Sequence, residues 1–252
     1  MSQDFQAMVR RLERAQAMQN ERFNQAGGGH SLAVGGGFAH FRGVGHPLNQ
    51  ALGLLEPLAE ADLDAVEAFL GQPTVLELSP GADPELWAQL ARRGYRLHQF
   101  QQLWARTLQA EEAFEASGTV RLADPGESDL FNQVVCAGFL ERNDWRDLKP
   151  PFEVSLDAPG AWGFLAFVEG QPAGGAMLGI VDGVALLSGD GVIPSCRGRG
   201  LQKALIRARL AFARDRGCDV ACASTAPGTA SQRSYEACGF HAEYPKVEMA
   251  RG

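Results

Sequence analysis

A glycine- and arginine-rich segment, Arg197-Gly198-Arg199-Gly200-Leu201-Gln202, has the residue types of a phosphate-binding loop. An apolar, strand-like run from Val184 to Leu187 precedes it, and a helical run that includes Ala204 follows it. The segment is therefore expected to join a strand to the N-terminus of a helix, where unpaired backbone N–H groups and a partial positive charge attract anions. The glycines let these amides approach a ligand, and the two arginines match phosphate geometry.

A second motif lies nearer the C-terminus and reads Ser231-Gln232-Arg233-Ser234-Tyr235-Glu236-Ala237-Cys238-Gly239-Phe240. Together the two motifs resemble the GNAT superfamily of N-acetyltransferases. The cofactor loop of that family reads Arg/Gln-x-x-Gly-x-Gly/Ala after a Val-x-Pro strand end, and a later helix ends Tyr-Glu-x-x-Gly-Phe. Gln202 departs from the pattern, because the family prefers Gly or Ala at that position.

The resemblance implies acetyl-CoA-dependent N-acetylation of a primary amine on a small molecule or peptide. It implies that residues 197–202 hold the pyrophosphate through backbone amides and that the Val192 N–H binds the thioester carbonyl. Ser231 occupies the position where many relatives carry an Asn that contacts the cofactor arm. Tyr235 matches the tyrosine that protonates the leaving sulfur, and the competing interpretation is a core tyrosine anchored by its hydroxyl.

Asp190 is the best candidate for the base that deprotonates the amine, because relatives often place an acid on this strand, acting directly or through water. The sequence Gly189-Asp190-Gly191 is as compatible with a turn or bulge. Three more carboxylates follow the first helix of this half: Glu141, Asp144 and Asp147. They either hold a cationic amine or form solvated surface, and we favour surface. Cys196 is either a reactive thiol or a small filler residue, and we favour filler.

Composition narrows the class of protein. Of 252 residues, 45% are hydrophobic and 21% charged, and the net charge of −7 argues against a broad nucleic-acid-binding surface. No apolar run approaches the ~20 residues of a membrane span, and the N-terminus has no apolar signal core. Five cysteines without a Cys-x-x-Cys pair indicate reduced thiols in a cytoplasmic protein. No histidine shows ligand spacing, so no metal is expected, and nothing indicates the oligomeric state.

Hydrophobic periodicity predicts an amphipathic helix over residues 2–25, ended by Gly27-Gly28-Gly29. Further helices are expected over 57–70, 84–93 and 129–139, from the Gly/Arg loop to Arg216, and around Tyr235. Strands are expected over 32–41 with a break at 35–37, 75–78, 96–107, 119–122, 162–168, 172–181, 184–193, 219–224 and 244–250. Residues 145–152 are ambiguous, because Pro150-Pro151 interrupts them.

The two halves share a frame when the numbering is shifted by 145. Val75 then falls on Val220, Gly94 on Gly239, and strand, helix, Gly-aromatic pair and final strand recur without a gap. The predicted fold is α/β, with two GNAT-like units in tandem, each a twisted mixed β-sheet flanked by helices. Residues 1–115 form a degenerate unit with an N-terminal helix, and residues 116–252 form the acetyltransferase domain.

The same shift places Leu52–Pro57 on Arg197–Gln202 and Leu90 on Tyr235. The first half then has no arginine at the loop, Glu56 would repel phosphate, and Pro57 lacks an amide N–H. Arg42-Gly43-Val44-Gly45 copies the loop only superficially, since no helical run follows it. The sequence therefore predicts one cofactor per chain, with a structural role for the first half.

Two other functions stay open. One is a non-catalytic acyl-CoA-binding or regulatory module. Gln202 and Ser231, which depart from the family pattern, are compatible with such a module, whereas Tyr235 favours an enzyme. The other is a tandem aminoacyl or acyl transferase that builds cell-wall or peptide bonds, although such enzymes are usually longer.

Overall fold

The structure, a computed structural model, describes residues 2–114, 118–151, 153 and 155–252. It divides into two compact units, Met1–Leu103 with Glu243–Gly252, and Trp104–Ala242. The predicted domains, residues 1–115 and 116–252, stay a prediction. The compact units follow a different division, because the break falls earlier and the last residues of the chain belong with the first unit.

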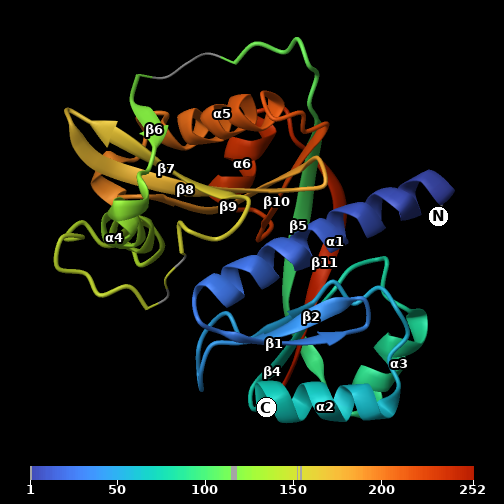
Figure 1. The fold of residues 1–252 in the computed structure, drawn as a ribbon. Helices are drawn as coiled ribbons and strands as arrows, with labels where there is room; N and C mark the ends of the chain where they lie inside the picture. Colours follow the sequence, from blue (N-terminus) through green and yellow to red (C-terminus); the bar gives the residue numbers. More distant parts are fainter. Residues whose placement is uncertain (1, 115–117, 152, 154) are drawn as a thin grey trace. The chain divides into compact units, whose positions relative to one another are not determined.

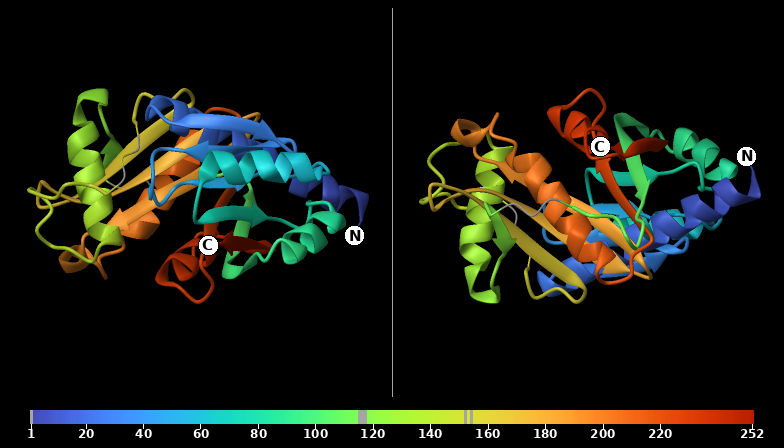
Figure 2. Two further views of the ribbon diagram at one scale, coloured as in Figure 1. Left: turned by 90° about the horizontal axis from the view of Figure 1, so that it is seen from below. Right: turned by 90° about the horizontal axis from the view of Figure 1, so that it is seen from above.

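The first unit contains a mixed sheet in the order β1-β2-β3-β4-β11-β5. Its strands are β1 (His30–Val34), β2 (Gly37–Phe41), β3 (Gln50–Leu52), β4 (Thr74–Leu78), most of β11 (His241–Arg251) and most of β5 (Arg96–Thr107). The β3–β4 pair is parallel, whereas β1–β2, β2–β3 and β4–β11 are antiparallel. The helices α1 (Gln3–Ala26) and α2 (Glu60–Leu70) lie on opposite faces of this sheet (Figure 1, Figure 2), and α3 (Pro84–Arg92) follows β4.

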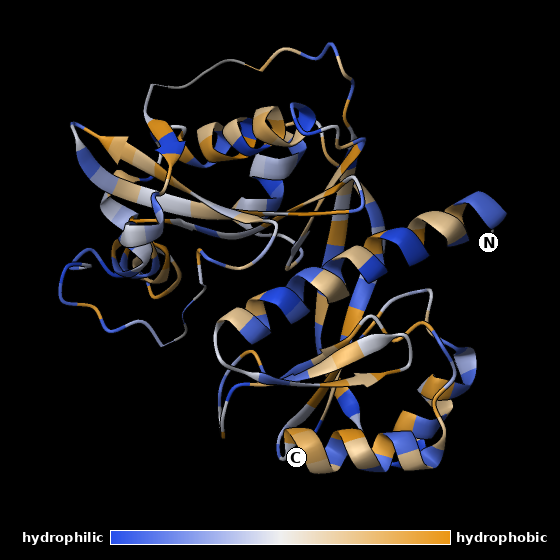
Figure 3. Cartoon of the chain, in the orientation of Figure 1, coloured by the Kyte–Doolittle hydropathy of each residue, from blue (hydrophilic) through white to orange (hydrophobic). Residues whose placement is uncertain are grey.

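The helix α1 forms because its sequence provides an N-cap residue and places apolar residues along one face. Ser2 is its N-cap, and the Ser2 Oγ accepts a hydrogen bond of 3.2 Å from the Phe5 N–H. Hydrophilic and hydrophobic residues alternate along it (Figure 3), and Val9, Leu12 and Ala15 are among its buried residues. The helix therefore packs an apolar stripe against β1 and β2.

A buried ion cluster joins α1, β4 and β11 within the first unit. The Lys246 ammonium is fully buried and lies 3.1 Å from the Glu13 carboxylate, and it also pairs with Glu77. The Tyr244 hydroxyl donates to Glu13 Oε1 at 2.8 Å. Burial raises the pKa of Glu13, while Lys246 opposes that rise. The cluster ties the N-terminal helix to the last strand of the chain.

The second unit contains a mixed sheet in the order β5-β10-β9-β8-β7-β6, to which β5 contributes residues 104–107. Its other strands are β6 (Val120–Leu122), β7 (Ala161–Val168), β8 (Gln171–Val181), β9 (Val184–Val192) and β10 (Val220–Thr225). The helices α4 (Ser128–Phe139) and α5 (Leu201–Arg214) cover opposite faces (Figure 1). Short 3₁₀ turns, η1 (Pro125–Glu127) and η2 (Pro194–Cys196), and the helix α6 (Ala230–Glu236) complete the unit.

The two predicted halves of the sequence, residues 1–115 and 116–252, exchange their last strands. In the chain β5 comes after α3, but the antiparallel partner of β4 is β11, with Val247 opposite Leu78. In the second unit the neighbour of β10 is β5, and the Trp104 indole N–H donates to Thr225 Oγ1 at 2.9 Å. Each half of the sequence therefore supplies a strand neighbour to the other half, while only the first compact unit includes a segment from the far end of the chain.

Most predicted elements are present, with ends that move by a few residues. The segment 32–41 forms the hairpin β1–β2, and α2 begins at Glu60 instead of residue 57. The strand β3 was not predicted, because three residues carry too little periodicity. Residues 145–151 form turns and no helix, while the end of the ambiguous segment, residue 152, lies outside the described residues. None of the five cysteines, all of which lie in the described ranges, forms a disulfide.

The shift of 145 holds for the last third of each half but fails before it. The strand β4, the helix α3 and the strand β5 coincide with β10, α6 and β11 to within two residues. The helices α2 and α5 begin at residues 60 and 201, an offset of 141, so the alignment of Leu52–Pro57 with the Gly/Arg loop is wrong by four residues. Counted from the helix starts, residues 56–61 stand opposite 197–202, and they still contain no arginine and include Glu56 and Pro57.

No helix in the described ranges is both long and apolar enough to cross a membrane.

Candidate functional site

The Gly/Arg segment joins β9 to α5 in the second unit, as the sequence predicts. Gly200 is the N-cap of α5 and has a φ of 77°, a left-handed conformation that favours glycine. A methyl group built on Gly198 or Gly200 would find no described atom within 4 Å, so the space over the loop is open. The first amides of α5 have no intrahelical acceptors, as at any helix N-terminus.

The Arg197 side chain is used inside the protein. Its guanidinium donates to the Val192 carbonyl at 3.2 Å and to the Gly138 carbonyl at the C-terminal end of α4 at 2.9 Å. It also pairs with the exposed Glu141 carboxylate at 2.7 Å, which lowers the pKa of Glu141. Arg197 therefore fixes the loop to the end of α4, so the predicted phosphate contacts fall to the loop backbone and to Arg199, which is exposed.

The strands β9 and β10 diverge beside this loop. Their parallel register runs from Val184 opposite Val220 to Leu186 opposite Cys222, whereas β9 continues to Val192 and β10 to Thr225. On its other edge β9 remains paired with β8, where the Ile193 N–H donates to the Ala173 carbonyl at 2.9 Å. Because neighbouring amides of a strand point to opposite edges, the Val192 N–H is directed to the edge of β9 that faces β10.

The end of β9 is held against α4 by two close backbone approaches. A Cβ on Gly191 would lie 2.4 Å from the Val135 carbonyl oxygen, and a Cβ on Gly138 would lie 2.6 Å from the Val192 nitrogen. Any larger side chain at either position would push α4 away from β9. These glycines therefore fix the position of the Val192 amide, the predicted donor to a thioester carbonyl.

The structure brings Asp190 and Tyr235 together. The Tyr235 hydroxyl donates to Asp190 Oδ2 at 2.6 Å, and the guanidinium of Arg209 pairs with Asp190 Oδ1. Both oxygens of the carboxylate are therefore engaged. Arg209 was not singled out from the sequence, although it lies among the apolar residues Leu205, Ile206 and Leu210 on the buried face of α5. A charged residue at such a position is a signal of a buried, paired charge.

Tyr235 lies in the core of the second unit. Its residue is only 1% exposed, and its ring packs edge-on against Phe240 with ring centres 5.0 Å apart. Burial, followed by the negative charge of Asp190, raises the pKa of Tyr235 well above its ordinary value. The phenol is therefore protonated at neutral pH, and its proton is directed to Asp190.

Three of the other residues singled out from the sequence lie near the Gly/Arg loop or in α6. Gln202 is in the first turn of α5, and its Nε2 is buried without a hydrogen-bond partner among the described residues. Ser231 is half-buried in the first turn of α6. Cys196 packs against Ile193 beside the core of α4, as a filler residue would.

The acidic segment after α4 lies on the surface. Asp144 pairs with Arg142, and Asp147 is exposed. Asn143, which was not predicted, accepts a hydrogen bond of 2.8 Å from the Ser195 N–H and ties the segment to the loop. Sequence reasoning could not find this contact, because the two residues lie far apart in the chain.

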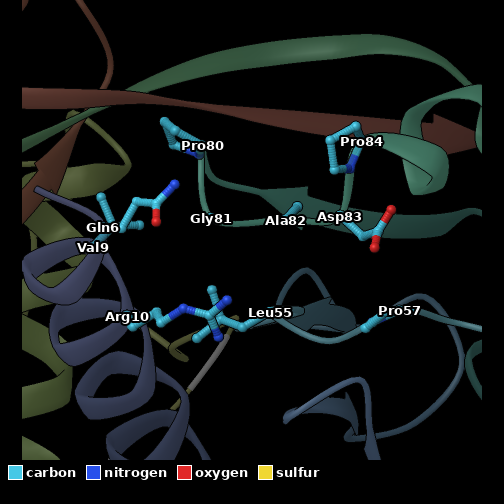
Figure 4. Close-up of a pocket in the computed structure, with 10 residues that line it drawn as sticks. All are labelled: Gln6, Val9, Arg10, Leu55, Pro57, Pro80, Gly81, Ala82, Asp83 and Pro84. Atoms are coloured by element: carbon cyan, nitrogen blue, oxygen red, sulfur yellow. The ribbon is translucent and has the colours of Figure 1, made fainter. Parts of the chain in front are cut away.

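The first unit has a pocket between the segment after β3 and the loop before α3. Leu55 and Pro57 come from the first of these segments, residues 80–84 from the second, and α1 adds Gln6, Val9 and Arg10 (Figure 4). The cavity volume is about 370 Å³. The wall combines the polar side chains of Gln6, Arg10 and Asp83 with apolar residues, among them three prolines, which have no N–H to donate to an anion.

Comparison with known proteins supports the family suggested by the motifs. Residues 128–240 match the model of the acetyltransferase (GNAT) family. The search of curated proteins found no match. A GCN5-related N-acetyltransferase from Kribbella flavida is similar over 94% of this chain and 95% of its own, with 18% identity and a TM-score of 0.64.

Two further solved structures share the fold. A tandem GNAT protein from the clavulanic acid biosynthesis pathway covers 87% of this chain and 80% of its own, at 16% identity and a TM-score of 0.59. An acetyltransferase of the GNAT family from Novosphingobium aromaticivorans covers 78% and 83%, at 20% identity and a TM-score of 0.53. The chain therefore has an α/β fold with GNAT-like neighbours, and the family match supports a GNAT acetyltransferase domain in residues 128–240.

Proposed function

We propose that the protein is an acetyl-CoA-dependent N-acetyltransferase that acts on a primary amine of a small molecule or peptide. The observation that carries the proposal is the divergence of β9 from β10 beside a glycine-rich loop at the N-terminus of α5. This arrangement offers a strand amide directed away from β8 and a set of helix amides to one extended ligand that has a carbonyl at one end and phosphates further along.

The groups at the loop fit the pyrophosphate of acetyl-CoA. The open space over Gly198 and Gly200 admits a large anion close to the backbone. The buried Gln202 Nε2 lacks a partner among the described residues and can donate to a phosphate oxygen. The departure of Gln202 from the family pattern therefore adds a donor to the site. Arg199, which is exposed, supplies the positive charge, since Arg197 is used to hold α4.

Acetyl-CoA supplies a thioester, an acyl group bound to a good leaving sulfur. In the reaction the amine nitrogen forms a bond to the acyl carbon, the carbon–sulfur bond breaks, the nitrogen loses a proton and the sulfur gains one. The Val192 N–H would stabilise the negative charge that develops on the carbonyl oxygen. Tyr235 would donate the proton to the sulfur, and the engagement of both Asp190 oxygens supports a role in holding Tyr235 over a role as a free base.

We also propose that the chain contains two GNAT-like units in tandem, of which the first is degenerate. The repeated order of strand, helix and strand at an offset of 145 supports the proposal. So does the parallel pair β3–β4, which precedes α3 as β9–β10 precedes α6. The first unit would then serve as a structural partner and bind no cofactor.

The burial of Tyr235 is the one observation that favours a binding module instead of an enzyme. A tyrosine that is 1% exposed and already donates its proton to Asp190 reaches a sulfur only if the bound ligand opens its surroundings. The two functions differ in one measurable property, because a binding module takes up acetyl-CoA without consuming it.

Release of free thiol from acetyl-CoA, measured with a panel of primary amines, tests the proposal. We expect amine-dependent thiol release that stops in the Gly200→Glu variant. Mixtures without amine measure background hydrolysis. Calorimetric binding of acetyl-CoA with no turnover on any amine of the panel would favour the binding module, and no binding at all would contradict both functions.

A further inference from the structure

Arg209 occupies a position where a charge is costly unless it is fully paired. It lies on the apolar face of α5, and none of its surface is exposed. Its guanidinium donates to the Leu205 carbonyl at 3.1 Å, to the Met177 carbonyl at 2.8 Å and to the Ser188 carbonyl at 3.4 Å. It also pairs with Asp190. These acceptors come from α5 itself and from the two strands β8 and β9.

The strand contacts of Arg209 surround a bulge in β9. Met177 is opposite Ser188 and Gly175 is opposite Gly191, so β9 has one more residue than β8 in this interval. Gly189 has a φ of 63°, which places the bulge at residues 189 and 190. Met177 and Ser188 form the last regular pair before the bulge, and Arg209 binds the carbonyls of both.

The bulge lies between the paired and the divergent parts of β9. Pairing with β10 ends at Leu186, the bulge follows, and the strand ends at Val192. A bulge bends a strand and increases its twist. Whatever fixes the bulge therefore sets the direction of the strand end and the position of the Val192 amide.

We propose that Arg209 is a positioning residue, which holds the β9 bulge through Met177, Ser188 and Asp190 and thereby aims the Val192 amide into the space between β9 and β10. The inference rests on the proposed function for its consequence, which is acetyl-CoA binding, but its structural part stands on the contacts alone. The Asp190 carboxylate links the same network to the Tyr235 hydroxyl, so Arg209 also orients the candidate proton donor.

Only a planar guanidinium satisfies this set of acceptors. Its five N–H donors lie in one fork, whereas a lysine ammonium is a compact charge with three donors at one point. A lysine at this position would keep the charge beside Asp190 and lose some of the carbonyl contacts. The Arg209→Lys variant is therefore expected to recover part of the function that an apolar residue loses.

The test uses the full chain and a pair of substitutions that leaves no unpaired buried charge. Removing Arg209 alone would leave the Asp190 carboxylate without its charged partner, so the variant is Arg209→Met combined with Asp190→Asn. The single variant Arg209→Lys tests rescue. Arg214→Met is the matched control, because Arg214 is a partly exposed arginine at the C-terminal end of α5 that pairs with Asp215 and donates to the Glu112 carbonyl instead of to carbonyls of β8 and β9.

Two measurements are made on each variant: amide hydrogen exchange over residues 188–192, and the affinity for acetyl-CoA with the kcat and KM of thiol release. We expect the double variant to exchange faster at these residues, with exchange over the first unit unchanged. Since a misplacement of ~1 Å costs about a hundredfold, we expect kcat/KM to fall by about that factor. Arg209→Lys should give intermediate values, and Arg214→Met should match the wild type.

Unchanged exchange over residues 188–192 in a folded double variant would overturn the proposal, and so would faster exchange with unchanged acetyl-CoA affinity and kcat/KM. If the double variant does not fold, Arg209→Lys decides alone: wild-type exchange and kinetics would contradict the role of the guanidinium fork. If the wild type itself binds no acetyl-CoA, the proposed function fails. The exchange data then still show whether Arg209 holds the bulge.

Discussion

The loop from β9 to α5 and the loop from β3 to α2 stand at the same point in the order of elements, but they offer different groups to a ligand. The first has two glycines with open space above them, two arginines and a buried amide donor without a partner among the described residues. The second has Glu56 and Pro57, and three prolines line its pocket. A shared arrangement of strand, loop and helix is therefore compatible with opposite affinities for phosphate, and the residue types of the loop decide.

The buried ion networks of the two units differ in where they lie relative to the candidate site. The Lys246 cluster joins α1, β4 and β11 and lies on the elements that hold the first unit together. The Arg209 network lies under a bulge at the end of a strand that borders the candidate site. The first network is expected to govern stability, and the second is expected to govern the site.

The exchange of the last strands gives the largest expected effect. A fragment of residues 116–252 lacks β5, the neighbour of β10, and leaves β11 without β4. We expect this fragment to be unfolded by circular dichroism and to bind no acetyl-CoA. Co-expression with residues 1–115 should restore both. A folded, cofactor-binding fragment would show instead that residues 116–252 form an independent domain.

The comparison of the two loops is sharpened by placing the same carboxylate in each. Gly200→Glu puts a negative charge beside the bound phosphates, which costs about 4 kcal/mol at ~4 Å and an effective dielectric of ~20, before screening. Calorimetry should show acetyl-CoA affinity lower by roughly a thousandfold. Gly200→Ala controls for the left-handed backbone, and Pro57→Glu should leave affinity unchanged. Equal losses of acetyl-CoA affinity in Gly200→Glu and Pro57→Glu would show that the two loops do not differ in phosphate binding.

The comparison of the two networks is tested by removing the cation of the first. Lys246→Met leaves the buried Glu13 and the partly buried Glu77 without their cation, and loss of one partner of a buried pair typically costs about 3–5 kcal/mol. Denaturant unfolding should show this loss in the free energy of unfolding. At temperatures where the variant is folded, its acetyl-CoA affinity should equal that of the wild type, and a large change would argue against separate roles.

The smallest expected effect concerns Tyr235. Tyr235→Phe removes only the hydroxyl, and a general acid typically contributes about a hundredfold or more in rate. Turnover should fall by about a hundredfold, with acetyl-CoA affinity nearly kept. If turnover is unaltered at saturating substrate, Tyr235 is a core tyrosine whose hydroxyl serves only to hold Asp190.

The parts of the fold that sequence could predict are those with a long periodic signal. The helix α1, the hairpin β7–β8 and the strand–loop–helix around residues 197–202 all have such a signal. The exchange of β5 and β11 has none, because period and composition do not record which strand a strand pairs with. For the same reason the contact between Asp190 and Tyr235, two residues predicted separately, came only from the structure.

The error in aligning the two loops has a physical cause. The helix α5 is 14 residues long and α2 is 11, so a constant shift fitted to the elements after them cannot hold before them. The prediction that the first half binds no cofactor does not depend on this error, because residues 56–61 are as poor in phosphate donors as Leu52–Pro57. Arg209 was missed because its chemistry depends on a bulge in a neighbouring strand, which no local pattern in α5 reveals.

Titration of the full chain with acetyl-CoA in a calorimeter tests most directly the claim that one of the two loops binds the cofactor. We expect one equivalent per chain, with binding abolished by Gly200→Glu and unaffected by Pro57→Glu. Two equivalents of similar affinity, or one equivalent that survives Gly200→Glu, would contradict it.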